Sequence, residues 1–151
     1  MMYDHDFKTY PELRNKELST MRYLSPHRQI TEDFQAVCER VVDGDTIMLS
    51  CDFRNFVFKL RITDLDAPEM NAGGKAAKEW LKQRIEGQEI TVLIDKYNRV
   101  DKYGRLLGQV IHRGQDVAQE EIYKGLAVPY SRRNEGKFPE LWKMFNIKKW
   151  V

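Results

Sequence analysis

Histidine and cysteine are scarce in this chain of 151 residues. The three histidines lie far apart, and the two cysteines, Cys38 and Cys51, form no C-x-x-C pair. A structural zinc site needs four closely spaced ligands, and zinc hydrolases usually rely on histidine ligands. The scarcity therefore excludes zinc ribbons and argues against hydrolases built on histidine-bound zinc or a histidine base.

Long apolar runs are also missing. No segment approaches the roughly 20 apolar residues of a membrane-spanning helix. The first residues, MMYDHDFKTY, lack the basic start and apolar core of a signal peptide. We therefore expect a cytoplasmic protein that does not bind membranes, with both cysteines reduced. The length suits one domain, and because nothing in the chain implies a protein partner, we expect a monomer.

The chain has no strong excess of one charge. It carries 25 basic and 23 acidic residues, a net charge of +2, which is too small to indicate a nucleic-acid binder. Only residues 131–151 are distinctly basic, with six basic and two acidic residues. Such a run is more often a solvated helix face, although here it could also add nonspecific affinity for a nucleic-acid backbone.

Residues 1–32 differ in pattern from the remainder. Apolar residues recur at roughly helical spacing between 11 and 24, and Pro11 suits a first helical turn. Ser25-Pro26 should end this helix. We expect a short helical extension of unassigned role, which packs on a domain at 33–151 or mediates association.

From Phe34 onward the pattern becomes mainly that of short strands. Alternation is clearest from Phe56 to Thr63, and turn signals such as Asp43-Gly44 separate the runs. We predict strands at 34–42, 45–51, 56–63, 89–95 and 105–112, and helices at 73–87, 116–124 and 137–146. This order predicts an α+β, mainly β fold: a small barrel with three helices.

Three carboxylates follow turns or strand ends. Asp45 comes directly after Asp43-Gly44, and Asp66 and Glu69 lie in the segment DLDAPE. Carboxylates without histidine favour a hard cation with oxygen ligands. Turn formation and helix capping explain any one of these residues equally well.

Two arginines add a second chemistry. Arg61 precedes Asp66 by five residues, and Arg105 ends the turn segment DKYGR. Guanidinium groups offer paired donors that match phosphate oxygens. A carboxylate-bound metal flanked by arginines is what phosphodiester hydrolysis requires. Either arginine alone is more often a surface salt bridge, and spacing does not show that the two converge.

Four segments together resemble the staphylococcal nuclease (thermonuclease) family. They are VVDGDT at 41–46, LRITDLDAPE at 60–69, DKYGR at 101–105 and GQDVAQEEIYKGLA at 114–127. Each is short, but their order and gaps fit, and the resemblance covers roughly residues 34–150. It implies a five-stranded barrel of the OB type with three helices.

The resemblance also implies roles for individual residues. It makes Ca²⁺ the cofactor, with Asp45, Asp66 and the backbone carbonyl of Ala67 as ligands. Glu69 would be the general base that activates water. The remaining residues would contact the substrate: Arg61 and Arg105 would stabilise the phosphate in the transition state, and Tyr103 and Tyr130 would lie near the bound nucleotide. Separately from the resemblance, we expect the charge of Lys102 to add nonspecific affinity for the nucleic-acid backbone.

The activity implied is that of a calcium-dependent endonuclease. It would cleave single-stranded DNA and RNA with little sequence specificity and leave 3′-phosphates. The alternative is a nucleic-acid-binding module of the same fold with weak or lost catalysis. Such modules usually lose the arginines or carboxylates, and all five are present here, which favours an active nuclease. A glycosidase that uses Asp66 and Glu69 is a weaker alternative, because it leaves the arginines without a purpose.

This chain departs from the family in two places near these residues. The segment between Glu69 and the next predicted helix is short. Asp64 adds a carboxylate that strict alternation would place on the apolar face, unless a bulge exposes it.

Overall fold

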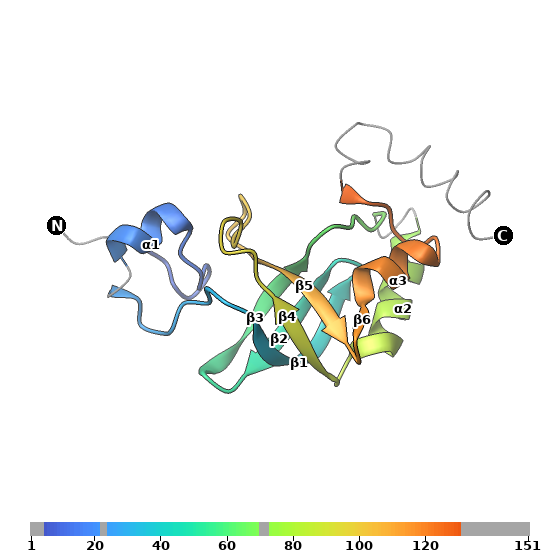
Figure 1. The fold of residues 1–151 in the computed structure, drawn as a ribbon, viewed down its shortest axis with the longest axis horizontal. Helices are drawn as coiled ribbons and strands as arrows, with labels where there is room; N and C mark the ends of the chain where they lie inside the picture. The colour runs from blue at the N-terminus through green and yellow to red at the C-terminus, as the bar shows by residue number, and fades with distance from the viewer. Residues whose placement is uncertain (1–4, 22–23, 70–72, 131–151) are drawn as a thin grey trace.

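The computed structural model describes residues 5–21, 24–69 and 73–130 (Figure 1). Its strands are β1 (Phe34–Asp43), β2 (Thr46–Cys51), β3 (Arg54–Ile62), β4 (Glu89–Leu93), β5 (Leu106–His112) and β6 (Gln115–Asp116). Its helices are α1 (Asn15–Met21), α2 (Gly74–Ile85) and α3 (Val117–Tyr123).

The first five strands close into a barrel. They pair in the order β3-β2-β1-β4-β5, with every neighbouring pair antiparallel. A parallel pairing of β3 with β5, in which Leu60 lies opposite Leu106, joins the two ends of the sheet. The predicted α+β fold, mainly β and with an OB-type barrel, is therefore confirmed. Only the two-residue β6 was not predicted, because it is too short to show a period.

Alternating side chains fill the barrel. Along β5 every second residue is buried, as a strand with one face toward a core requires. The apolar face of α2, formed by Ala77, Leu81 and Ile85, is fully buried and covers one end of the barrel. In Figure 1, α2 and α3 lie together at this end, and α1 lies beyond the opposite end. The functional residues are thus carried by a rigid closed scaffold.

The predicted starts and stops of the helices are largely confirmed. The Asp116 carboxylate caps α3 by accepting from the backbone N–H groups of Ala118 and Gln119. Gly125, with φ of 73°, follows its end. The predicted helix at 137–146 and the basic run at 131–151 lie outside the described residues.

The start of the N-terminal helix was predicted wrongly. α1 begins at Asn15, four residues after Pro11. The preceding residues are drawn into contacts with other segments, because the Leu13 N–H donates to the Gln29 side chain and the Leu13 carbonyl accepts from Arg99. These tertiary hydrogen bonds override the local helical preference.

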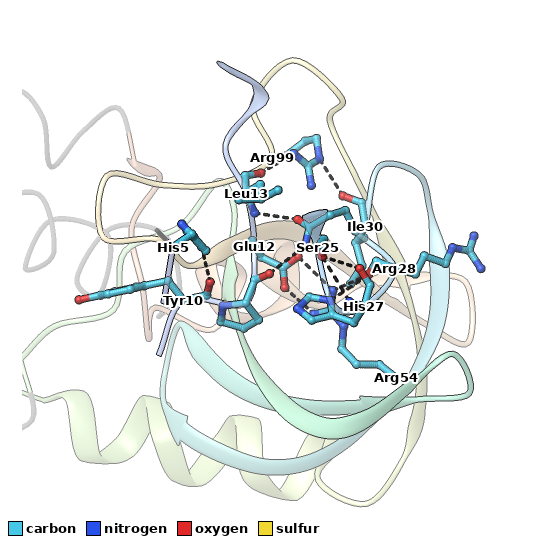
Figure 2. Close-up of polar contacts among 12 residues, drawn as sticks. His5, Tyr10, Glu12, Leu13, Ser25, His27, Arg28, Ile30, Arg54 and Arg99 are labelled. Carbon is cyan, nitrogen blue, oxygen red and sulfur yellow. Dashed lines mark hydrogen bonds and ion pairs between the residues drawn. The ribbon is translucent and has the colours of Figure 1, made fainter. Parts of the chain in front are cut away.

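A buried ion pair anchors the extension to the barrel (Figure 2). Glu12 accepts from both terminal nitrogens of Arg54, at 2.5 and 3.2 Å, and the side chains are 2% and 0% exposed. The Arg99 guanidinium, also buried, donates to the carbonyls of Ile30 and Leu13. Because two barrel arginines bind the chain on either side of α1, the extension is fixed against the barrel.

Two smaller expectations concern the cysteines and the membrane. Both cysteines are free thiols, with Cys38 buried in β1 and Cys51 half-buried at the end of β2. Among the described helices, none is long and apolar enough to cross a membrane.

We predict that Glu12→Gln lowers the free energy of unfolding by about 3 kcal/mol, because it leaves the Arg54 charge buried without its counter-ion. Urea denaturation followed by circular dichroism measures this. Glu32→Gln is the matched control: Glu32 pairs with Arg28 at 3.3 Å but is 75% exposed, so its loss should cost under about 0.5 kcal/mol. Equal effects of the two substitutions would contradict the anchoring role of the buried pair.

Candidate functional site

The β2–β3 hairpin places Asp45 beside Arg61. Thr46 pairs directly with Arg61 across the two strands, and the Ile62 N–H donates to the Asp45 carbonyl at 2.8 Å. Asp45 itself lies in the tight turn between β1 and β2, where its N–H donates to the Asp43 carboxylate at 3.1 Å. Strand register therefore sets the separation of Asp45 and Arg61.

Gly44 in this turn serves packing. Its φ is not positive, unlike that of five other glycines, so the turn does not need glycine for its backbone angles. A Cβ at Gly44 would lie 2.7 Å from the Ala67 Cβ and 2.8 Å from the Ala77 Cβ. The missing side chain thus lets the β1–β2 turn approach both α2 and the segment that carries Asp66.

Arg61 brings two carboxylates together. Its Nη2 lies 2.8 Å from an Asp66 oxygen and 3.6 Å from an Asp45 oxygen. All three side chains are largely buried, with exposures of 4% to 14%. The Ala67 N–H donates to the same Asp45 oxygen at 3.3 Å. Asp45, Arg61 and Asp66 therefore form one cluster.

The backbone around Asp66 is held on both sides. Asp66 and Val128 exchange N–H···O=C bonds of 2.8 and 3.0 Å, which ties the segment after β3 to the segment after α3. Asp64 has φ of 71° and is exposed. This left-handed residue interrupts the alternation, so that Leu65 enters the core and Asp64 points away from the cluster.

Asp43 is a site neighbour that the sequence analysis treated only as part of a turn. Burial, together with a hydrogen bond to Asp45 and the Asp45 charge, raises the pKa of Asp43 to about 6. Burial also acts to raise the pKa of Asp45, but the hydrogen bond from Asp43 and the Arg61 charge outweigh it and lower that pKa. The two carboxyl groups are thus joined by a hydrogen bond in which Asp43 is the protonated partner and Asp45 the ionised one.

Glu121 is a second residue that the sequence analysis missed. It belongs to α3, is fully buried, and neither carboxyl oxygen has a hydrogen-bond partner among the described residues. One oxygen lies 3.3 Å from the position of a Cβ on Gly44, beneath the turn between Asp43 and Asp45. Burial, followed by the charges of Asp45 and Asp43, raises the pKa of Glu121 to about 9. It is therefore a neutral carboxylic acid at pH 7.

Glu69 is exposed and lies three residues after Asp66. Its carbonyl accepts from the Gly74 N–H at 2.9 Å, at the first residue of α2. The short connection expected after Glu69 is thus present, and the N-terminus of α2 holds the Glu69 backbone.

Arg105 lies on the neighbouring strand connection. β3 and β5 pair Arg61 with Leu107, and Arg105 precedes this partner by two residues, on the same side of a pleated strand. Its Nε donates to Asp101 at 2.7 Å, and its side chain is 30% exposed. Asp101 therefore orients the guanidinium through its Nε. Among the described residues, none forms a hydrogen bond with the terminal nitrogens of Arg105.

Three further predicted residues lie on the surface nearby. Tyr103 is 62% exposed, with the Lys102 Nζ 5.2 Å and the Arg105 Cζ 5.4 Å from its ring centroid. Tyr130 is 51% exposed and follows Val128, the backbone partner of Asp66, by two residues. Both tyrosines can therefore offer a ring face to a ligand.

The cluster has the donors of a hard-cation site. Asp45 and Asp66 supply carboxylate oxygens. Burial, with a further contribution from the neighbouring carboxylates, raises the pKa values of Asp43 and Glu121. Protonation of Asp43 and Glu121 lowers the negative charge of the cluster, and a bound cation would have the same effect. Among the described residues, no three carboxylate, histidine or cysteine side chains are grouped closely enough to hold an ion. A cation here would therefore use the aspartates with backbone or water oxygens.

Known proteins resemble the chain over this region. A family model described as staphylococcal nuclease homologue matches residues 59–149, which begins after Asp45 and includes Arg61, Asp66, Glu69 and Arg105. The chain is 36% identical over 112 residues to Endonuclease YhcR of Bacillus subtilis, covering 65% of this chain and 9% of that protein.

Two shorter relatives show similar identity. An uncharacterized endonuclease of Escherichia coli O157:H7 is 37% identical over 97 residues, covering 63% of this chain and 60% of the relative. The thermonuclease of Staphylococcus hyicus is 32% identical over 109 residues, covering 67% and 62%. The chain thus spans less than two thirds of each of these relatives.

We predict that Glu121 makes stability depend on pH. Because its pKa is raised from 4.5 to about 9 on folding, its favourable contribution is complete below about pH 4.5 and is lost as pH rises toward 9. Between about pH 5 and 9, the unfolding free energy of wild type should fall by about 1.4 kcal/mol per pH unit relative to Glu121→Gln and Glu121→Leu. Denaturation in chelator measures this. Parallel pH profiles for all three proteins would contradict a buried, neutral Glu121.

Proposed function

The chain belongs to the staphylococcal nuclease family, and we propose that it is an endonuclease that hydrolyses single-stranded DNA and RNA with Ca²⁺. The observation that carries the proposal is the shared contact of Arg61 with Asp45 and Asp66. This contact holds Arg61, which we assign to phosphate binding, in one buried cluster with the two aspartates that we assign as cation ligands. Because the relatives are matched only in part, the activity of the whole protein is proposed on this geometry.

We assign the calcium ligands to Asp45, Asp66 and the Ala67 carbonyl, with water completing the shell. The donors are all oxygen, which suits a hard cation, and the Ala67 N–H already orients the Asp45 carboxylate at 3.3 Å. When bound, the ion supplies positive charge that stabilises the phosphate oxygens and makes a nearby water more acidic.

Glu69 is proposed as the general base. Glu69 is exposed, so a water molecule can reach it, while Pro68 and the hydrogen bond from Gly74 restrict its backbone. It accepts the proton of the attacking water as the new P–O bond forms. The P–O5′ bond then breaks, the 5′-oxygen takes up a proton from water, and the phosphate stays on the 3′ side.

Arg61 and Arg105 are proposed to bind the phosphate that is attacked. Arg61 lies on β3, and Arg105 directly precedes β5, two residues before the Leu107 that pairs with Arg61. Each guanidinium is oriented by a carboxylate. Negative charge grows on the phosphoryl oxygens in the transition state, where fixed guanidinium groups stabilise it more strongly than in the ground state. Tyr103, Tyr130 and Lys102 are proposed to contact the flanking nucleotides.

We predict that Glu69→Gln reduces the rate of cleavage of single-stranded DNA by about 10²–10⁴-fold, because the base is lost. Arg61→Ala should reduce it by about 10²–10³-fold. The assay follows degradation of labelled DNA with Ca²⁺ and with excess chelator. Glu79→Gln and Arg40→Ala change exposed residues outside the cluster and serve as matched controls.

Tight binding of DNA by wild type without cleavage would instead support the alternative of a binding module. Full activity in chelator would reject the dependence on a cation.

We further predict that Ca²⁺ raises the melting temperature and that Asp66→Asn abolishes this increase. A ligand that binds only the folded state at 100 times its Kd stabilises by about 2.7 kcal/mol. Asp64→Asn is the matched control, since Asp64 is exposed and turned away from the cluster. Differential scanning fluorimetry with and without Ca²⁺ compares the two variants. Equal calcium responses in both would remove Asp66 from the ligand set.

A further inference from the structure

A groove runs between the extension and the barrel. It has a volume of about 470 Å³ and is lined by residues 8–12 of the extension, by Met48 and residues 56–59 of the β2–β3 hairpin, and by residues 103–106. The last segment carries Arg105, so one end of the groove lies at the proposed phosphate site. Residues 8–12 supply one whole wall, so the groove depends on the packing of this part of the extension against the barrel.

The accessible charges of the groove are positive. Lys8 and Lys59 are exposed in its walls, and Arg105 lies at the end near the cluster. Among the described residues of the lining, Glu12 is the only acidic one, and it is buried and paired with Arg54. An occupant of complementary charge is therefore an anion that extends from Lys8 and Lys59 to Arg105.

Two aromatic rings accompany these charges. Tyr10 and Tyr103 line the groove and are 45% and 62% exposed. The Tyr10 ring packs over Gly104: a Cβ at Gly104, where φ is 82°, would lie 2.7 Å from the ring. Figure 2 shows Tyr10 projecting away from the buried polar contacts of the extension. Exposed rings between cations suit stacked bases joined by phosphates.

The aromatic wall is held in place by hydrogen bonds. The His5 ring bonds to the Tyr10 carbonyl at 2.8 Å, and the Tyr10 N–H donates to the Asp6 carbonyl at 2.9 Å. Arg14 donates to the Lys102 carbonyl at 2.8 Å, which ties the extension to the turn that carries Arg105. The groove is thus a preformed feature with a fixed position relative to the cluster.

We propose that this groove binds the nucleotides of a single-stranded substrate that flank the cleaved phosphate. The proposal rests on the proposed nuclease function and extends it, by giving residues 8–12 of the extension the role of a substrate-binding wall. Tyr10 and Tyr103 stack on bases, and Lys8 and Lys59 contact phosphates. Bases in a duplex are already stacked on each other, so the rings select single strands.

The test measures binding in chelator, so that cleavage cannot interfere. Fluorescence anisotropy with labelled oligothymidylates of about two and about ten nucleotides separates the cluster from the groove, because only the longer one spans both. Wild type should bind the longer oligonucleotide more tightly. Lys8→Gln with Lys59→Gln should weaken that binding roughly ten-fold at low salt and reduce the slope of log K against log salt by about 1.4. Tyr10→Ala should weaken it about five-fold or more.

Matched controls keep net charge and surface aromatics equal. Lys82→Gln with Lys124→Gln removes two exposed lysines on α2 and after α3, and Tyr97→Ala removes a tyrosine that is 81% exposed outside the groove. These variants should bind the longer oligonucleotide within two-fold of wild type. Thermal melting of every variant shows that the fold is retained.

Two results would overturn the groove assignment. One is that the groove variants and the controls bind the longer oligonucleotide alike. The other is that a duplex of equal length depends on Tyr10 as strongly as the single strand does. If wild type cleaves DNA while either result holds, the proposed nuclease function stands without the groove. If wild type cleaves nothing but long single strands still depend on Lys8, Lys59 and Tyr10, the groove stands without catalysis.

Discussion

The ion pair between Arg61 and Asp66 is the interaction on which the rest of the site depends. It spans the end of β3 and the turn that follows, and its 2.8 Å contact is almost completely buried. The same guanidinium nitrogen reaches Asp45 across the hairpin. Removing it would leave two buried carboxylates uncompensated, a cost of several kcal/mol. The cluster therefore needs a positive charge, and Arg61 supplies it in the absence of a cation.

The neighbouring carboxyl groups hold their protons more tightly than free ones. Burial is the main cause that raises the pKa of Asp43 to about 6 and that of Glu121 to about 9, and the single Arg61 charge offsets it only in part. A cation at Asp45 and Asp66 would free Arg61 to contact a phosphate. Binding of a cation and binding of a phosphate would then be coupled through the Arg61 side chain, so that each favours the other.

The fold was largely predictable from sequence because its signals are local. Alternation from Phe56 to Thr63 and the helical spacing of Ala77, Leu81 and Ile85 reflect burial on one face. The start of α1 could not be predicted in this way. Glu12 pairs with Arg54 and the Leu13 carbonyl accepts from Arg99, and both arginines lie far along the chain. Local propensity cannot register such contacts.

The candidate site was predictable in its residue types and not in its geometry. That Arg61 meets both Asp45 and Asp66 depends on strand register and on the left-handed turn at Asp64. Glu121 carried a signal that could have been used: it lies four residues after Val117, on the buried face of α3. A glutamate at a core position must be either paired with a cation or protonated, because an unpaired charge is rarely buried.

A crystal structure with Ca²⁺ and a non-hydrolysable single-stranded oligonucleotide tests the central claim most directly. The account predicts one calcium ion on Asp45, Asp66 and the Ala67 carbonyl, with Arg61 and Arg105 both within hydrogen-bond distance of a single phosphate. Glu69 should lie one water molecule from its phosphorus atom. An Arg61 still held between the two aspartates, with the phosphate bound elsewhere, would contradict it.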